Sequence, residues 1–168
     1  MSNKKYEFTN ETKAVKDVLG NFHTLHRIRA LKDFGDVNKG DLGGWLEKES
    51  NLSQEGNCWV YDNAMVYGNA QVYGYAWVYD NAKVYGNAQV YDNAHVYGNA
   101  QAFGHARVCD NAKVYDEAQV YGYTWVCGHA RVFDDAQVYD DAQVSDNAQV
   151  YGNAQVDGSA GVFENAMV

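Results

Sequence analysis

The stretch VYDNAHVYGNAQ, residues 90–101, contains two nearly identical six-residue units. Each unit reads Ala, a variable residue, Val, Tyr, Gly or Asp, and Asn, and the unit continues through most of the chain. Valine recurs at every sixth position over residues 60–168 and alanine over residues 64–166, and the exceptions are Ala102 and Thr124. Such fixed spacing predicts an ordered repeat architecture rather than a disordered low-complexity segment.

A period of six fits neither the 3.6-residue turn of a helix nor the plain two-residue alternation of a strand. It fits a four-residue strand followed by a two-residue corner, where Gly, Asp and Asn tolerate positive φ. Alternation along the strand places Ala and Val on one face and the variable residue and Tyr on the other. Because Ala and Val hardly vary, we expect them to form a narrow core and the other two side chains to face outward.

The hexad resembles the left-handed β-helix family of hexapeptide-repeat proteins. The resemblance implies three hexads in each triangular coil of 18 residues, with coils stacked ~4.8 Å apart. The expected fold is therefore all-β: a left-handed parallel β-helix, a triangular solenoid of about six coils over residues 45–168, with no α-helix inside it. Residues 1–44 are expected to form a small capping segment. The familiar hexad has a small residue where this chain has Tyr, so an aromatic row is expected outside.

The first 57 residues lack the hexad. TLHRIRAL, residues 24–31, is typical of a strand, and residues 32–47 are typical of turns followed by a short strand. Leu46, Leu52 and Cys58 are spaced six apart in the alanine register, which predicts that coiling begins just before Leu46.

The run from Arg27 to Ala64 is similar to the opening of uncharacterised hexapeptide-repeat proteins of phages and prophages. This resemblance implies a phage-like origin and supplies no function. Mechanically, the N-terminal segment can cap the first coil, because an open β-edge invites further pairing.

The net charge of −9 lies entirely in residues 58–168, since residues 1–57 hold nine basic and nine acidic side chains. An acidic array repels phosphate backbones, so no nucleic-acid partner is expected, although an acidic face can mimic nucleic acid. No apolar run is long enough for a membrane span, and the N-terminus has no secretory signal pattern. Three cysteines form no disulfide framework, which predicts the reducing cytoplasm of a bacterial host.

Residues 18 apart should form vertical columns on the outside of the solenoid. Two columns are almost entirely aromatic: Tyr61, Tyr79, Tyr97, Tyr115, Phe133, Tyr151, and Tyr67, Tyr85, Phe103, Tyr121, Tyr139, Asp157. They are either self-stacking ladders that stabilise neighbouring coils or a rigid platform for a protein or glycan. Trp77, Tyr79 and Tyr97 are therefore candidates for binding a partner.

The third column is interrupted by Cys109 and Cys127, which are expected to be adjacent thiols on an outer face, with Cys58 pointing inward. Arg107 should lie one coil from Trp125, close enough for a cation–π pair, and both are partner-binding candidates. Loss of the tyrosine by neutral drift is the alternative. A metal site here is not favoured, because a fourth ligand and CxxC spacing are missing.

Two charged features complete the exterior. One column, Trp77, His95, Lys113, Arg131, is the only cationic stripe. Acidic candidates for binding a partner gather at corners of the later coils: Asp116, Glu117, Asp134, Asp135, Asp140 and Asp141. Stacked like charges cost stability, so the cluster needs a reason: solubility, a weak Ca²⁺ site, or an acidic face for a basic partner.

The family resemblance implies one enzymatic alternative, a hexapeptide-type acyltransferase. Such enzymes need a histidine base, a projecting loop and a groove for the acyl donor. The uninterrupted register over residues 64–168 leaves no loop to build a pocket, and His95, His105 and His129 have no evident orienting partner. No catalytic, cofactor-binding or metal-binding residue is therefore assigned.

The favoured function is non-enzymatic protein–protein binding, for instance by a phage-encoded blocker of a host antiviral-defence protein. A structural or assembly spacer in a phage particle is the alternative. The partner is a host or phage protein of unknown identity.

The sequence ends in mid-pattern at GVFENAMV, residues 161–168. A bare last coil would expose unpaired backbone groups, which predicts a homodimer that pairs two C-terminal coils through Val162, Phe163 and Val168.

Overall fold

The computed structural model describes residues 3–168. An antiparallel hairpin of β1 (Tyr6–Lys16) and β2 (Phe22–Ala30) is followed by β3 (Leu42–Leu46) and a short 3₁₀ helix, η1 (Glu49–Asn51). The remaining strands have two residues each: β4 (Trp59–Val60), β5 (Met65–Val66), β6 (Gln71–Val72), β7 (Trp77–Val78), β8 (Lys83–Val84), β9 (Gln89–Val90), β10 (His95–Val96), β11 (Gln101–Ala102), β12 (Arg107–Val108), β13 (Lys113–Val114), β14 (Gln119–Val120), β15 (Trp125–Val126), β16 (Arg131–Val132), β17 (Gln137–Val138), β18 (Gln143–Val144), β19 (Gln149–Val150), β20 (Gln155–Val156) and β21 (Gly161–Val162).

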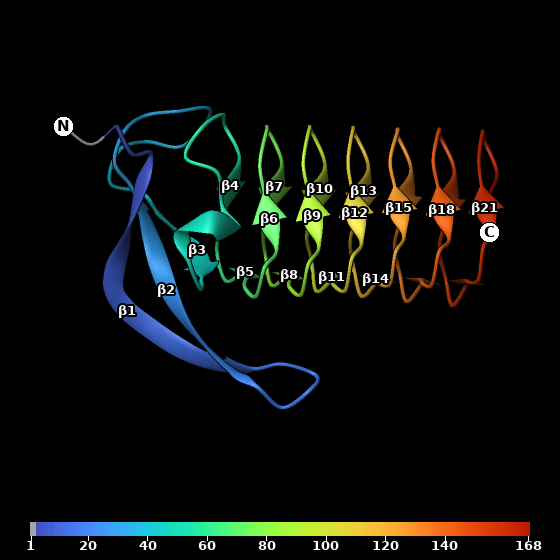
Figure 1. The fold of residues 1–168 in the computed structure, drawn as a ribbon. Coiled ribbons are helices and arrows are strands. Elements are labelled where there is room, and N and C mark those ends of the chain that lie inside the picture. Colours follow the sequence, from blue (N-terminus) through green and yellow to red (C-terminus); the bar gives the residue numbers. More distant parts are fainter. Residues whose placement is uncertain (1–2) are drawn as a thin grey trace.

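The short strands stack into three parallel sheets that run the length of a three-sided solenoid (Figure 1). Every third strand belongs to the same sheet, so His95 pairs with Trp77 on one side and Lys113 on the other. Two sheets have six strands, and the third has nine because β3, β2 and β1 extend it at the N-terminal end. The solenoid has about seven turns with coils of about 18 residues, and the expected β-helix is confirmed.

The inward residues are those that the repeat predicts. Alanines and valines of the hexads are buried through most of the solenoid, and Cys58 points inward in an alanine position. The expected strand at residues 24–31 is confirmed by β2, and the expected short strand by β3. Among the described residues, no helix is long and apolar enough to cross a membrane.

The first coil departs from the expected register. Leu46 pairs with Val66 and Leu52 bridges to Val72, which places both leucines in valine positions. The alanine register predicted for them is wrong, because leucine is too large for the position that alanine fills in the later coils. The two additional residues of this coil lie between Leu52 and Cys58, where the chain loops outward.

A buried lysine closes the end of this first coil. The Lys5 ammonium donates to the carbonyl oxygens of Glu55, Gly56 and Cys58 and lies 3.3 Å from the Cys58 sulfur. Burial lowers the pKa of Lys5, and Cys58 partly offsets that shift. In the N-terminal segment, the Lys5 ammonium thus provides hydrogen-bond donors for backbone carbonyl groups at the end of the core.

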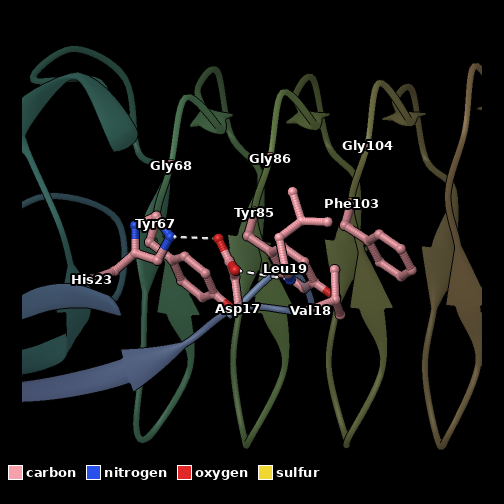
Figure 2. Close-up of a pocket in the computed structure, with 10 residues that line it drawn as sticks. All are labelled: Asp17, Val18, Leu19, His23, Tyr67, Gly68, Tyr85, Gly86, Phe103 and Gly104. Carbon is pink, nitrogen blue, oxygen red and sulfur yellow. Dashed lines mark hydrogen bonds and ion pairs between the residues drawn. The ribbon is translucent and has the colours of Figure 1, made fainter. Parts of the chain in front are cut away.

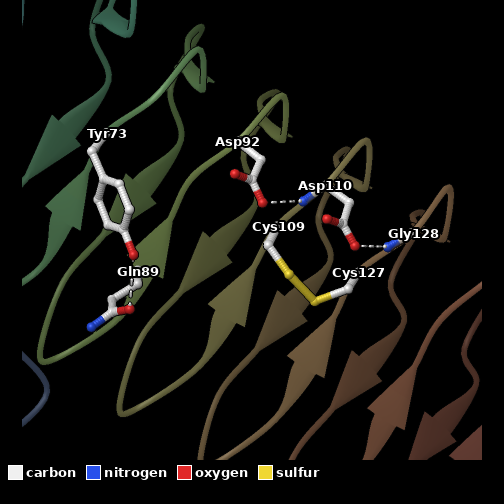
Figure 3. Close-up of a disulfide and its surroundings, with 7 residues drawn as sticks. All are labelled: Tyr73, Gln89, Asp92, Cys109, Asp110, Cys127 and Gly128. Atoms are coloured by element: carbon white, nitrogen blue, oxygen red, sulfur yellow. Dashed lines mark hydrogen bonds between the residues drawn. A yellow bond between two sulfur atoms is a disulfide. The ribbon is translucent and has the colours of Figure 1, made fainter. Parts of the chain in front are cut away.

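Aspartates at the corners hold one coil to the next. Asp134 has φ of 57°, and its carboxylate accepts a hydrogen bond of 3.0 Å from the backbone N–H of Gly152, one coil further on. The same bond joins Asp110 to Gly128, beside the disulfide in Figure 3. These bonds give a structural reason for stacking acidic residues at the corners, which the sequence left open.

We expect Asp134→Ala to lower the free energy of unfolding by about 1–2 kcal/mol, since alanine loses the hydrogen bond and tolerates positive φ poorly. Asp134→Gly should cost less, because glycine loses the same hydrogen bond but relieves the backbone strain. Urea unfolding measures both. Asp135→Ala, one residue further at the same corner and without positive φ, is the control. Equal costs for Asp134→Ala and Asp135→Ala would contradict this role.

Thr124 disturbs the corner where the repeat has alanine. At the other corners the alanine N–H donates to the carbonyl three residues earlier, as Ala106 does to Phe103. Among the described residues no such bond joins Thr124 to Tyr121, and the buried Thr124 hydroxyl has no partner.

We therefore expect Thr124→Ala to raise the free energy of unfolding by about 1 kcal/mol, since it removes a buried unpaired hydroxyl and allows the regular turn. The reverse change in the neighbouring coil, Ala106→Thr, should lower it. Thermal unfolding measures both. A loss of stability in Thr124→Ala would show that its methyl group matters more than its hydroxyl.

The expectation of two free outer thiols is wrong. Cys109 and Cys127 are stacked neighbours as predicted, but they form a disulfide across adjacent coils (Figure 3). Their Cα atoms are 4.7 Å apart, because parallel coils stack at a distance that a disulfide can span. A reducing compartment was expected because the cysteines seemed to form no disulfide, and this disulfide removes that reason. A cytoplasmic location stays a prediction.

The aromatic columns form stacked ladders, which confirms one of the two interpretations. Tyr97 and Tyr115 have ring centroids 4.9 Å apart and planes 2° apart, and Tyr73 and Tyr91 stack in the same way. Whether a ladder also binds a partner stays a prediction.

At the far end, Phe163 and Val168 are exposed while Val162 remains buried. A homodimer through this coil stays a prediction, and so does the division of the chain at residue 44.

Candidate functional site

The N-terminal hairpin does more than cap the solenoid. It runs back along it (Figure 1), and Leu25 packs with Trp45, Met65, Tyr67 and Tyr85 in a second apolar cluster. Tyr67 and Tyr85 face away from the Ala/Val core as expected, but the hairpin covers them, and their exposed fractions are 3% and 6%. The hairpin also supplies the projecting loop that the regular hexads seemed to exclude.

A cavity of about 250 Å³, the hairpin slot, lies between the hairpin tip and one aromatic ladder (Figure 2). The tip contributes Val18 and Leu19, and the ladder contributes Tyr67, Tyr85 and Phe103. The corners along this wall are glycines in three successive coils, Gly68, Gly86 and Gly104. Because no corner aspartate projects there, the wall stays apolar.

His23 lies at one end of the slot between two carboxylates. Its Nδ1 is 2.8 Å from Glu47 Oε2, and its Nε2 is 2.9 Å from Asp17 Oδ2. The other oxygen of Glu47 accepts a hydrogen bond from the Gly68 N–H, which fixes that carboxylate to the solenoid. The imidazole also packs on Tyr67, with centroids 5.1 Å apart.

These carboxylates favour the charged imidazole. The hydrogen bond to Asp17 raises the pKa of His23, and Glu47 adds to the rise, against an opposing effect of partial burial. In return, His23 lowers the pKa of Asp17 to about 2, assisted by the backbone N–H groups of Asn21 and Leu19 in the hairpin turn. In this closed arrangement both ring nitrogens are occupied, and the protonated form of the ring is favoured.

The arrangement has the parts of a general base. Glu47 is anchored and fixes one ring nitrogen, while Asp17, which covers the other, belongs to the hairpin turn. Displacement of Asp17 by a ligand would present Nε2 to the slot and lower the pKa of the ring. Sequence reasoning missed this pair, because His23 and Glu47 are 24 residues apart and carry no motif.

The residues predicted from the sequence lie on other parts of the surface. Arg107 stacks over Trp125 at 4.7 Å, as expected. The Asp134 backbone N–H donates to Asp116, and the Glu117 N–H donates to the Asp134 carbonyl oxygen, so the acidic residues are neighbours at one corner. Their binding to a partner stays a prediction, as it does for Asp135, Asp140, Asp141, Trp77, Tyr79 and Tyr97.

The three histidines considered as bases have structural surroundings. His95 stacks on Trp77, and burial together with Lys113 lowers its pKa. His105 stacks on Tyr123, and His129 lies beside Arg131. Within residues 3–168, no hydrogen bond joins any of these three rings to a carboxylate.

Comparison with known proteins bears on the repeats. Residues 60–74, 88–104 and 142–158 match the family described as YdcK Beta solenoid repeat. The chain is also similar to the Uncharacterized acetyltransferase YdcK of Escherichia coli (strain K12), with 42% identity over 67 residues. That match covers 35% of this chain and only 19% of the relative's length. The relative is bacterial, so a phage origin has no support here and stays a prediction. Parts of the repeat region are therefore similar to the YdcK β-solenoid repeat.

Proposed function

We propose that the protein transfers a short acyl group from a thioester to a hydroxyl or amine, with His23 as the general base. The observation that carries the proposal is the His23–Glu47 pair at the end of the apolar hairpin slot. The name of the E. coli relative, an acetyltransferase, agrees with it. This reverses the preference drawn from the sequence, which depended on the absence of a projecting loop.

The slot suits the acyl group of such a donor. Its walls are tyrosine, phenylalanine and leucine side chains, and its volume of about 250 Å³ is below that of typical drug-sized sites. A short acyl chain fits these dimensions better than a long one.

The proton transfers follow from the position of the ring. When the acceptor takes the place of Asp17 at Nε2, the pKa of the ring falls and Nε2 releases its proton to solvent. The acceptor then gives its own proton to that nitrogen while its oxygen or nitrogen attacks the thioester carbonyl carbon. The carbon–sulfur bond then breaks, and the leaving sulfur takes the proton from the imidazolium. Glu47 holds Nδ1 throughout and stabilises the transient positive charge.

The test is thiol release from acetyl-coenzyme A by the full chain, with a panel of small amines and sugar hydroxyls as acceptors. Background interference is small, because Cys58 is buried and the other two cysteines are in a disulfide. Acceptor-dependent release above the uncatalysed rate supports the proposal. The proposal is overturned if no acceptor in the panel causes thiol release and if adding acetyl-coenzyme A leaves the NMR signals of Tyr67 and Tyr85 unchanged.

Protein–protein binding, preferred from the sequence, is the second candidate. A separate observation favours it: Val18, Leu19 and Phe22 at the hairpin tip have exposed fractions of 75%, 84% and 74%. Adjacent exposed apolar side chains are typical of interaction sites. Capture of one protein from bacterial lysate by wild type, but not by a variant with Ser at these three positions, would support it. Equal capture by both would exclude the hairpin tip.

A further inference from the structure

One aromatic ladder is interrupted at its first step. From Tyr79 to Phe133 successive rings are nearly parallel, with planes 2–3° apart. Tyr61 is instead turned 89° to Tyr79, and it also meets Trp77 edge-on at 72°. The rotated ring gives up a stacking contact that the later coils make.

A second aromatic cavity lies beside the rotated ring and shares no lining residue with the hairpin slot. It has a volume of about 350 Å³ and is lined by Tyr61, Trp77 and Tyr79 together with Asp36 and Asp62. The three rings come from two adjacent coils, and Tyr61 is close to perpendicular to the other two. Trp77 also stacks on His95, and Tyr79 on Tyr97. Asp36 comes from the turn between Phe34 and Val37 of the N-terminal segment, so this cavity too is built where that segment meets the solenoid.

The charges around this cavity have one sign. Both ionisable side chains besides tyrosine that line it are carboxylates, and no lysine or arginine is among the lining residues. The pKa of Tyr61 is raised to about 12, mainly by burial and then by Asp36 and Asp62, which places both negative charges near the ring hydroxyl. A net charge of −9 adds a long-range attraction for cations.

From this geometry we infer that Tyr61, Trp77 and Tyr79 form an aromatic cage for the quaternary ammonium group of a small molecule. Ring faces attract a cation through their quadrupoles, and the attraction is larger when the cation sheds water easily. An alkylated ammonium does so, whereas a bare ammonium is strongly hydrated. The carboxylates of Asp36 and Asp62 supply the countercharge.

A neutral probe of the same shape separates charge from simple apolar fit. Isothermal titration with tetramethylammonium and choline should give saturable binding, and 3,3-dimethylbutan-1-ol, the uncharged analogue of choline, should bind at least about tenfold more weakly. Equal affinity for choline and the neutral analogue would overturn the inference. Binding of simple sugars in place of choline would do the same.

Variants place the binding on this cavity. Trp77→Gln should weaken choline binding at least about tenfold, and it should fold, since glutamine occupies the same repeat position in many coils. Trp125→Gln, the same change at the equivalent position of another face, should leave binding unchanged. Loss of binding in both variants, or in neither, would contradict the assignment. Binding of a trimethyllysine peptide without binding of choline or tetramethylammonium would overturn the small-molecule ligand.

Discussion

Val114→Asp is expected to lower the free energy of unfolding by about 4 kcal/mol or more. Val114 is fully buried in the middle of the solenoid, paired with Val96 in one coil and Val132 in the next. A carboxylate at this position would have no partner and would lose its hydration. Since each coil is stabilised mainly by its neighbours, the defect should also separate the array into two shorter halves.

Gln119→Asp is the matched control. Gln119 occupies the variable position of β14, next to Gln101 and Gln137, where the side chain points away from the core. The same carboxylate there should cost less than about 1 kcal/mol. Urea unfolding followed by circular dichroism compares the two, and a second transition in Val114→Asp would report the separated halves. Equal midpoints would contradict the assignment of inner and outer faces.

The fold was predictable because each hexad repeats one local solution. Alternation in Ala-x-Val-Tyr identifies the buried face without any long-range information, and a period of 18 places Arg107 beside Trp125. The same arithmetic could have found the disulfide: Cys109 and Cys127 are 18 apart, and one coil step is within disulfide reach. Composition alone suggested free thiols, and the register should have taken precedence.

The N-terminal segment was less predictable because its contacts are not periodic. Nothing in the repeat reports that Leu25 covers Tyr67 and Tyr85, or that Lys5 donates to the carbonyl of Cys58, 53 residues away. The hairpin slot depends on that packing, so its existence follows only from the folded chain. One signal was present in the sequence, the run of corner glycines at 68, 86 and 104 without an aspartate, but it has no meaning until the hairpin is placed beside it.

His23→Gln is expected to reduce acceptor-dependent acyl transfer on the order of 10²–10⁴-fold, the usual contribution of a general base. The acyl donor should still bind, since the slot walls are unchanged, so the loss should fall on kcat rather than on KM. His26→Gln is the matched control, because His26 lies on the same strand but stacks on Phe8 away from the slot. A loss of equal size in both variants would point to damage to the hairpin and against a catalytic role.

The pH profile of Asp17→Asn separates a base from a merely structural histidine. Asp17 is the largest contributor to the raised pKa of His23, so replacing its carboxylate with an amide should lower that pKa. The neutral, active form of the ring should then be populated at lower pH. The rising limb of the kcat/KM profile should therefore move to lower pH while the plateau is kept. Stability should respond differently. The ion pair of Asp17 and His23, which we call the hairpin clamp, is complete only where Asp17 is ionised and His23 is protonated. In wild type its contribution to the free energy of unfolding is therefore lost as pH rises through the raised pKa of His23. Above that pH the unfolding midpoints of wild type and Asp17→Asn should converge. A kcat/KM profile that does not move, with midpoints that still converge, would leave His23 as part of the hairpin clamp and remove it from the reaction.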